Sequence, residues 1–161
     1  MSTDFDGLLG ALSNGGVDFI IVGGLAATLH GSARATYDVD VVYSRSPDNI
    51  KRLVTTLAPL EPYLRGAPPG LPFQFNLETV RRGLNFTLAT TLGDLDLLGE
   101  IVGGGDYGAL LPHSAHVELF GHPCRCLTLE ALIRAKRAAG RPRDLEALAE
   151  LEALLEDRRK T

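Results

Sequence analysis

The sequence predicts an α+β fold: a small mixed β-sheet with helices on one side, completed by a C-terminal helical pair. Three observations point to this class. Short runs rich in Val, Ile and Leu alternate with segments that carry helix-start signals, residues 85–101 alternate as in a β-hairpin, and two capped helical segments close the chain. We expect one domain over residues 1–161, with a sheet core at 1–127 and the helical pair at 128–161.

The N-terminal part alternates helix and strand. Residues 3–12 predict a short helix, which ends at the sequence SNGG. The apolar run at 17–22 predicts a strand that turns at a Gly-Gly pair into a second short helix. Residues 37–43, YDVDVVY, predict the next strand. Ser46 then caps a helix that has Pro47 in its first turn, a typical start signal.

A proline-rich segment and a hairpin follow. Five of the nine prolines lie within residues 59–72, which predicts a loop and a candidate place for substrate contact. In the hairpin at 85–101, the turn is expected near Gly93 and Asp94.

The remaining segments complete the expected order. Residues 103–111 predict a glycine turn into a helix, and residues 116–127 predict another short strand pair. Thr128 caps a helix that Gly140 ends, and Pro142 begins a last helix that reaches about residue 158.

Composition favours a cytoplasmic protein that does not enter a membrane. Hydrophobic residues make up 45% and charged residues 22%, which is ordinary for a globular domain. No apolar run is long enough to span a bilayer, and the N-terminus lacks the basic and apolar regions of a secretory signal. We expect the two cysteines, Cys124 and Cys126, to be free thiols, since a bridge between such near neighbours is strained.

Positive charge is concentrated near the C-terminus, although the net charge of the chain is −4. The stretch from Arg134 to Arg143 holds five cations and no acid. Two interpretations stay open: a solvated helix face, or a site for a polyanion such as a triphosphate or an RNA backbone.

Three aspartates are candidates for a metal site. Asp38 and Asp40 lie two positions apart in a valine-rich strand, so their side chains share one face. Like charges on one face repel each other unless a cation offsets them, and Mg²⁺ prefers oxygen ligands. Asp96 lies inside the second strand of the hairpin, where Asp is disfavoured, whereas Asp94 suits a turn. A strand face exposed to solvent is the alternative explanation.

Two further features suit a phosphate group. The pair Gly23 and Gly24 allows close approach of an anion to the backbone at a helix start. Lys136 lies on the apolar stripe of its helix, and Asp144 shares a face with leucines of the last helix. This Lys and Asp either form a structural ion pair, or Lys136 binds nucleotide phosphates while Asp144 holds it in place.

These residues resemble the polymerase-β-like nucleotidyltransferase superfamily. Its signature is a strand, a Gly-Gly or Gly-Ser pair at a helix start, an Asp-x-Asp strand about a dozen residues later, and a further acidic strand. The segments RATYDVDVV, GDLDLLGEIVGGGDY and LTLEALIRAKRAAGRPRDLEAL also resemble minimal bacterial nucleotidyltransferases of the abortive-infection, type IV toxin group. In this chain Gly-Gly replaces the commoner Gly-Ser pair, which keeps the backbone donors but loses a hydroxyl.

The resemblance implies metal-dependent transfer of an NMP from an NTP, such as ATP, to a hydroxyl of an RNA 3′ end, a protein or a small molecule. It also implies Mg²⁺ or Mn²⁺ as cofactor and, for a toxin, a tRNA or other RNA acceptor and a cognate antitoxin protein. The implied catalytic residues are Asp38, Asp40, Asp96, Lys136 and Asp144, with the three acids first named as metal ligands. The implied nucleotide-binding residues are Gly23, Gly24, Arg34, Thr36 and Lys136. Within the family roles, two acids bind the metals and the third, here Asp96, activates the attacking hydroxyl.

Two other functions remain open. One is a catalytically inactive domain of the same fold that binds a nucleotide or a partner protein, although the presence of all three acids counts against it. The other is a structural scaffold, which would leave an inward-facing acid cluster unexplained.

Overall fold

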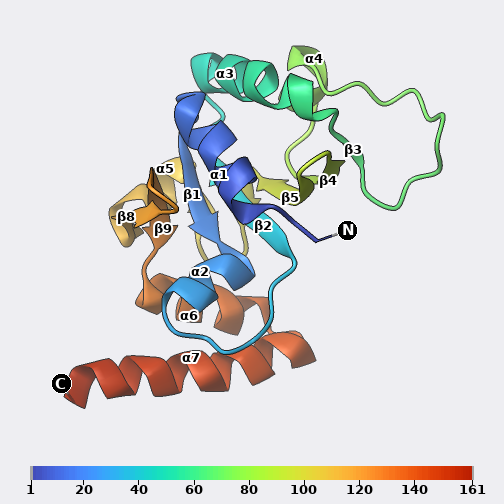
Figure 1. Ribbon diagram of the computed structural model, residues 1–161. Helices are drawn as coiled ribbons and strands as arrows, with labels where there is room; N and C mark the ends of the chain where they lie inside the picture. Colours follow the sequence, from blue (N-terminus) through green and yellow to red (C-terminus); the bar gives the residue numbers. More distant parts are fainter. Residues whose placement is uncertain (1, 161) are drawn as a thin grey trace.

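A seven-stranded mixed β-sheet organises the chain (Figure 1). A computed structural model describes residues 2–160. The strands of the large sheet are β1 (Phe19–Val22), β2 (Asp38–Tyr43), β3 (Tyr63–Leu64), β4 (Phe86–Thr90), β5 (Gly93–Leu98), β8 (Ser114–Leu119) and β9 (His122–Leu127). Their order is β3-β4-β5-β2-β1-β9-β8, and only the β2–β5 and β1–β9 pairs are parallel. Two short strands, β6 (Glu100–Ile101) and β7 (Gly105–Asp106), form a separate ribbon.

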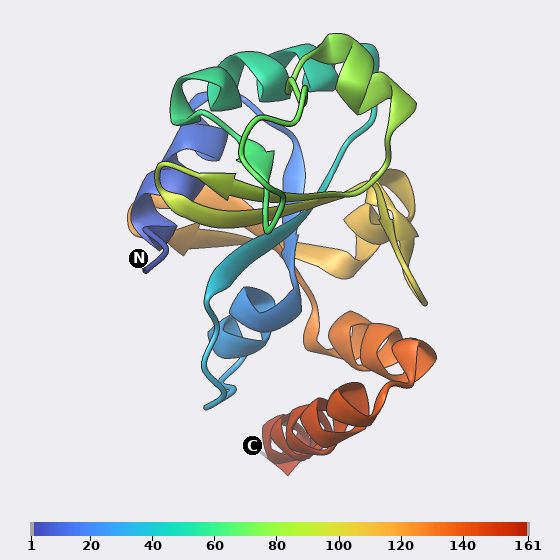
Figure 2. The same cartoon turned by 90° about the vertical axis from the view of Figure 1, so that its right-hand side faces the viewer.

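Helices lie on both sides of this sheet. They are α1 (Phe5–Asn14), α2 (Gly23–Leu29), α3 (Pro47–Leu57), α4 (Leu77–Arg82), α5 (Tyr107–Leu110), α6 (Leu129–Ala139) and α7 (Pro142–Lys160). In Figure 2, α3 and α4 lie above the sheet, whereas α2 and the pair α6–α7 lie below it. The space between the sheet and the C-terminal pair is where the candidate site described below is located.

Side-chain caps fix where the main helices begin. Asp4, Ser46 and Thr128 each precede a helix and accept a hydrogen bond from a backbone N–H in its first turn. Gly140 ends α6 in the left-handed conformation, with φ of 65°, which a residue without a side chain adopts freely. The sequence therefore sets these boundaries locally.

The hydrophobic core lies between one face of the central strands and the helices α1 and α3. All four residues of β1 are buried, and β2 buries Val39 and Val41 on the face opposite its two aspartates. Leucines of α1 and α3, such as Leu8 and Leu53, are fully buried in the same cluster. Burial on one face leaves the other face of β2 free for charged groups.

The C-terminal pair is fastened to the rest of the chain by polar contacts. The carboxylate of Glu150 in α7 accepts hydrogen bonds from the Ser32 hydroxyl (2.5 Å) and the Ala33 backbone (3.0 Å). At the end of α2, His30 hydrogen-bonds through Nε2 to the Leu127 carbonyl (2.8 Å) and through Nδ1 to Arg158 (2.8 Å). These contacts hold α7, and the end of β9 from which α6 continues, in a defined position relative to α2.

The predicted α+β class, with its mixed sheet and C-terminal helical pair, is confirmed, whereas the helices expected on one side of the sheet lie on both sides (Figure 2). Cys124 and Cys126 are free and buried, and burial raises the pKa of the two thiols to about 11 and about 12, respectively. Within residues 2–160, no helix has both the length and the apolar character needed to cross a bilayer.

Two details of the predicted elements are wrong. Asp94 does not lie in the hairpin turn, because β5 begins at Gly93 and already contains it. The proline-rich segment is not only a loop, because Tyr63–Leu64 pairs with β4 as the edge strand of the sheet. Both differences affect the candidate site.

Candidate active site

Strand pairing places four aspartates on one face of the sheet. Strands β2 and β5 run parallel in a register that sets Asp38 beside Asp94 and Asp40 beside Asp96. Because successive residues of a strand alternate between faces, all four side chains project to the same side. We call these four residues the acid cluster. The strand of Asp96 is therefore the direct neighbour of the strand that carries Asp38 and Asp40.

Three members of the acid cluster are close enough to share a cation. Asp38, Asp40 and Asp96 each offer a carboxylate oxygen, and these oxygens all lie within 4.8 Å of one another. No other group of three or more potential metal ligands is this close within residues 2–160. An all-oxygen donor set with this much negative charge suits Mg²⁺ or Mn²⁺.

The raised pKa values of Asp40 and Asp38 indicate that the acid cluster holds too little positive charge to balance its carboxylates. Burial, and then the neighbouring carboxylates of Asp38 and Asp96, raise the pKa of Asp40 to about 8. Burial and Asp96 also raise the pKa of Asp38. The Oδ1 oxygen of Asp40 is buried and accepts no hydrogen bond from the described part of the chain. A buried carboxylate oxygen without a donor is costly, and a divalent cation would satisfy it. The residues present therefore fit a metal ion.

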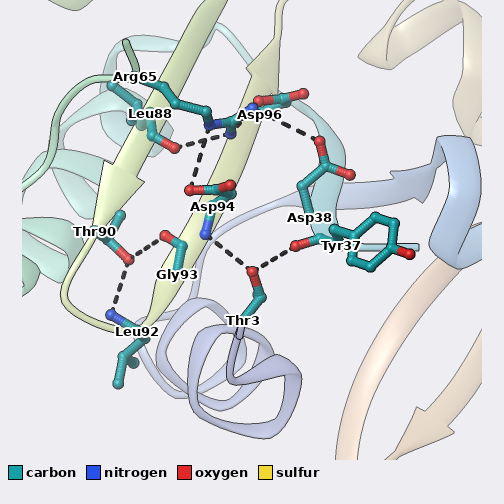
Figure 3. A network of polar contacts seen from close by, with 10 residues as sticks. All are labelled: Thr3, Tyr37, Asp38, Arg65, Leu88, Thr90, Leu92, Gly93, Asp94 and Asp96. Carbon is teal, nitrogen blue, oxygen red and sulfur yellow. Dashed lines mark hydrogen bonds and ion pairs between the residues drawn. The ribbon is translucent and has the colours of Figure 1, made fainter. Parts of the chain in front are cut away.

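One arginine contacts the acid cluster, and the sequence prediction missed it. Arg65 directly follows β3, and its guanidinium lies 2.6 Å from Asp96, 3.4 Å from Asp94 and 3.7 Å from Asp38 (Figure 3). The same guanidinium donates a hydrogen bond to the Leu88 carbonyl. No local sequence signal identifies this residue, because its role depends on the pairing of β3 with β4.

A hydroxyl near the N-terminus connects the starts of the two acidic strands. Thr3 donates from Oγ1 to the Tyr37 carbonyl (2.5 Å) and accepts from the Asp94 backbone N–H (3.2 Å) (Figure 3). Gly93 adopts a φ of +119°, and a Cβ at this position would collide with Thr3. These contacts fix the register that brings Asp38 and Asp94 side by side.

The Gly-Gly pair lies directly beside the acid cluster. Gly23 has a positive φ of 65°, and a Cβ on it would collide with the carboxylate of Asp40. A Cβ on Gly24 would lie 2.8 Å from the Thr36 hydroxyl. The pair therefore lets the backbone at the start of α2 approach Asp40 as no other residue could.

A pocket of about 560 Å³ opens between the acid cluster and the C-terminal helices. Its lining includes Gly23 and Asp40 from the sheet side and Lys136, Arg141 and Asp144 from the C-terminal segment. Apolar side chains from β5, β6 and α6 complete the lining. The pocket thus brings an acid of the cluster and two cations to one cavity.

The predicted contact between Lys136 and Asp144 is present, with 3.3 Å between Nζ and Oδ1. Asp144 is only 1% exposed and also binds Arg141, which approaches its Oδ2 to 2.6 Å and donates a backbone N–H as well. Hydrogen bonds from Arg141 and then from Lys136 lower the pKa of Asp144 to about 2. We call Lys136, Arg141 and Asp144 the basic cluster. Arg141 was not predicted as a site residue, although it belongs to the basic run.

Thr36 and Arg34, the remaining predicted site residues, differ in their relation to the site. The Thr36 hydroxyl lies beside Gly24 and bonds to the Asp38 carbonyl (3.4 Å), which keeps it next to the site. Arg34 is exposed and interacts with Glu150 of α7. The pKa of Glu150 is lowered by hydrogen bonds from Ser32 and Ala33 and then by the charge of Arg34.

Comparison with known proteins identifies the fold. No protein-family model and no curated protein sequence matches the chain. Solved structures do match: a candidate nucleotidyltransferase from Thermotoga maritima superposes with a TM-score of 0.57 and 16% identity, over 89% of this chain and 87% of that one.

Two antibiotic-modifying enzymes share the same architecture. The lincosamide antibiotic adenylyltransferase LnuA, bound to lincomycin, matches with a TM-score of 0.60 and 12% identity, over 95% of this chain and 98% of that one. ANT(2'')-Ia, in complex with adenylyl-2''-tobramycin, matches with a TM-score of 0.51 and 17% identity, over 95% and 93% of the two chains. The chain therefore has a nucleotidyltransferase fold.

Proposed function

We propose that the protein is a metal-dependent nucleotidyltransferase that moves an NMP from an NTP to a hydroxyl acceptor. The observation that carries this proposal is that Asp40, which shares a candidate cation site with Asp38 and Asp96, lines the same pocket as Lys136 and Arg141. An NTP needs both: divalent cations for its phosphates and additional positive charge for the leaving pyrophosphate. The fold shared with adenylyltransferases supports the same chemistry.

In this proposal the three acids hold Mg²⁺ or Mn²⁺. When bound, the metal neutralises phosphate charge and polarises the phosphate that is transferred. Lys136 binds the β- and γ-phosphates, and Asp144 together with Arg141 orients Lys136. Gly23 and Gly24 give the triphosphate access to the backbone beside Asp40.

The transfer step uses Asp96 as the proton acceptor. The acceptor oxygen attacks the α-phosphorus, so that an O–P bond forms while the bond from the α-phosphorus to the pyrophosphate oxygen breaks. The proton of the attacking hydroxyl passes to the Asp96 carboxylate, and pyrophosphate leaves with the electron pair of the broken bond. Arg34 and Thr36 are expected to contact the nucleotide, and of the two only Thr36 lies next to the Gly-Gly pair.

A small molecule is the acceptor class we favour. LnuA is bound to lincomycin and ANT(2'')-Ia to an adenylylated tobramycin, and both structures align with nearly all of this chain. An RNA acceptor, a toxin role and an antitoxin partner stay predictions from the sequence resemblance. Within the basic run, Lys136 and Arg141 pair with Asp144, and Arg137 pairs with Glu152. Two acids thus offset part of the charge of these three cations, which weakens the case for a long polyanionic acceptor and leaves surplus positive charge beside Asp144.

The test is a transfer assay on the intact protein. The chain is incubated with each α-labelled NTP, with Mg²⁺ or Mn²⁺, and with total RNA, cell lysate or a panel of small hydroxyl compounds including aminoglycosides and lincosamides. The proposal expects label to move to one acceptor class only when metal is present. Transfer that persists in excess chelator would contradict it.

A second candidate function is nucleotide binding without turnover. One observation favours it: Arg65 already occupies part of the acid cluster with a positive charge. Binding of an NTP with no label transfer to any acceptor, with the metal present, would support this alternative.

A further inference from the structure

Arg65 reaches the acid cluster from the far edge of the sheet. Its backbone N–H donates to the Thr87 carbonyl (3.0 Å), which continues the pairing of β3 with β4 by one residue. Its side chain then crosses β4, where the guanidinium also donates to the Leu88 carbonyl (2.9 Å). Strand β4 therefore holds both the backbone and the guanidinium of Arg65, independently of the carboxylates.

The three ion pairs of Arg65 are unequal. The Asp96 oxygen is closest at 2.6 Å, Asp94 follows at 3.4 Å, and Asp38 is farthest at 3.7 Å. Among the described residues Arg65 is the one cation within ion-pair distance of these acids, and it makes no such pair with Asp40. It thus approaches from the side of β4, whereas the nucleotide pocket lies on the side of Gly23 and Asp40.

We propose that Arg65 is a positioning residue that shares Asp38 and Asp96 with the metal ion. Its guanidinium fixes Asp96 through a short contact that persists when the metal binds, and it gives up the longer contact to Asp38. The inference rests on the proposed function, since it assigns Arg65 the task of orienting the carboxylate that takes the proton.

Two opposite consequences follow from this sharing. Removing Arg65 takes away a positive charge that repels the divalent ion, so metal binds more tightly. The same change leaves Asp96 without its closest partner, so the carboxylate loses its fixed orientation and turnover slows. A residue that only supported the fold would not produce tighter metal binding together with slower turnover.

The experiment compares three variants of the full-length protein. Arg65→Met removes the charge and keeps the bulk, and Arg65→Lys keeps the charge and loses the forked geometry. The matched control is Arg82→Met on nearby α4, since Arg82 forms an exposed ion pair with Glu78. Mg²⁺ affinity is measured by calorimetry without nucleotide, and kcat and KM for the NTP are measured by label transfer.

For Arg65→Met we expect Mg²⁺ to bind about 10-fold tighter, the order that Coulomb's law gives for removing a unit charge near a divalent ion in a hydrated site. We expect kcat to fall by about 10- to 100-fold with KM for the NTP unchanged, as for loss of a partner that orients a metal ligand. Arg65→Lys should keep the Mg²⁺ affinity and recover part of kcat, and it also serves if the Met variant does not fold. Arg82→Met should match the wild type.

Unchanged or weaker Mg²⁺ binding by Arg65→Met would overturn the inference, as would an unchanged kcat in an active enzyme. If the wild type transfers no label, the proposed function fails, but the inference is then decided by the calorimetric comparison alone.

Discussion

The acid cluster and the basic cluster both contribute residues to one pocket, but their buried carboxylates lie in opposite electrostatic environments. In the acid cluster, one arginine pairs with three of the four aspartates, and the fourth, Asp40, keeps an oxygen with no donor among the described residues. In the basic cluster, a single aspartate, Asp144, binds two cations and both of its oxygens are occupied. The pKa of Asp40 is accordingly raised to about 8, whereas that of Asp144 is lowered to about 2.

The difference shows which cluster is complete. The basic cluster has satisfied its acid and retains surplus positive charge, so it can bind an anion without rearranging. The acid cluster is stable as four anions only if further positive charge arrives. The proposed substrate, a metal-bound NTP, would meet both requirements.

The largest expected effect is that of Asp40→Asn. We expect the rate of label transfer to fall by more than about 100-fold. Loss of a residue that only supports a metal ligand costs up to about 100-fold, and Asp40 is proposed to be a ligand itself. The fold should be retained, because a neutral amide relieves the repulsion among the acids. Transfer kinetics and circular dichroism check this, with the exposed Asp48→Asn as control. Full activity of Asp40→Asn would refute the metal assignment.

Metal and pH should act together on stability. Without metal, native Asp40 holds its proton up to about pH 8, whereas an aspartate in the unfolded chain has its ordinary pKa of 3.8. The native state then binds more protons between these values, so the free energy of unfolding falls as pH rises through that window. Mg²⁺ binds the ionised form and should restore about 2.7 kcal/mol at 100 times its Kd, mainly at alkaline pH.

Urea unfolding at about pH 5 and about pH 8.5, with and without Mg²⁺, measures how the free energy of unfolding depends on pH and metal. Asp40→Asn should flatten both the pH dependence and the Mg²⁺ effect. Equal stabilisation by Mg²⁺ at the two pH values would contradict the proposed protonation of Asp40.

A smaller effect is expected from Lys136→Met. KM for the NTP should rise by about 10-fold or more, since a hydrogen bond to a charged group contributes about 1.5–3 kcal/mol. Stability should change little, because Arg141 still binds Asp144. The control is Arg137→Met on the same helix, whose exposed pair with Glu152 contributes little. An unchanged KM would leave Lys136 as a purely structural partner of Asp144.

The smallest effect is expected in acid. Because the pKa of Asp144 is about 2 in the native state and has its ordinary value of 3.8 in the unfolded chain, the unfolded chain binds more protons between these values. The stability that Asp144 contributes is therefore lost as pH falls through this window. Asp144→Asn should remove that part of the acid dependence in urea unfolding, whereas the exposed Asp157→Asn should not. Identical acid profiles for Asp144→Asn and the wild type would be inconsistent with the paired carboxylate.

The sequence by itself determined the elements and the chemistry of single strands. Caps at Ser46 and Thr128 and the stop at Gly140 are encoded within a few residues, so they could be predicted. The shared face of Asp38 and Asp40 follows from the two-residue repeat of any strand, and the pairing of Lys136 with Asp144 follows from the apolar stripes of two adjacent helices.

Only the tertiary structure decided which groups join these residues. The register of β2 on β5 brought Asp94 into the acid cluster, and the pairing of β3 with β4 carried Arg65 to acids about 30 residues away in either direction. Such contacts depend on strand order and on the reach of a long side chain across a neighbouring strand. Neither leaves a periodic or capping signal in the chain, because both are set by packing between segments that are distant in sequence.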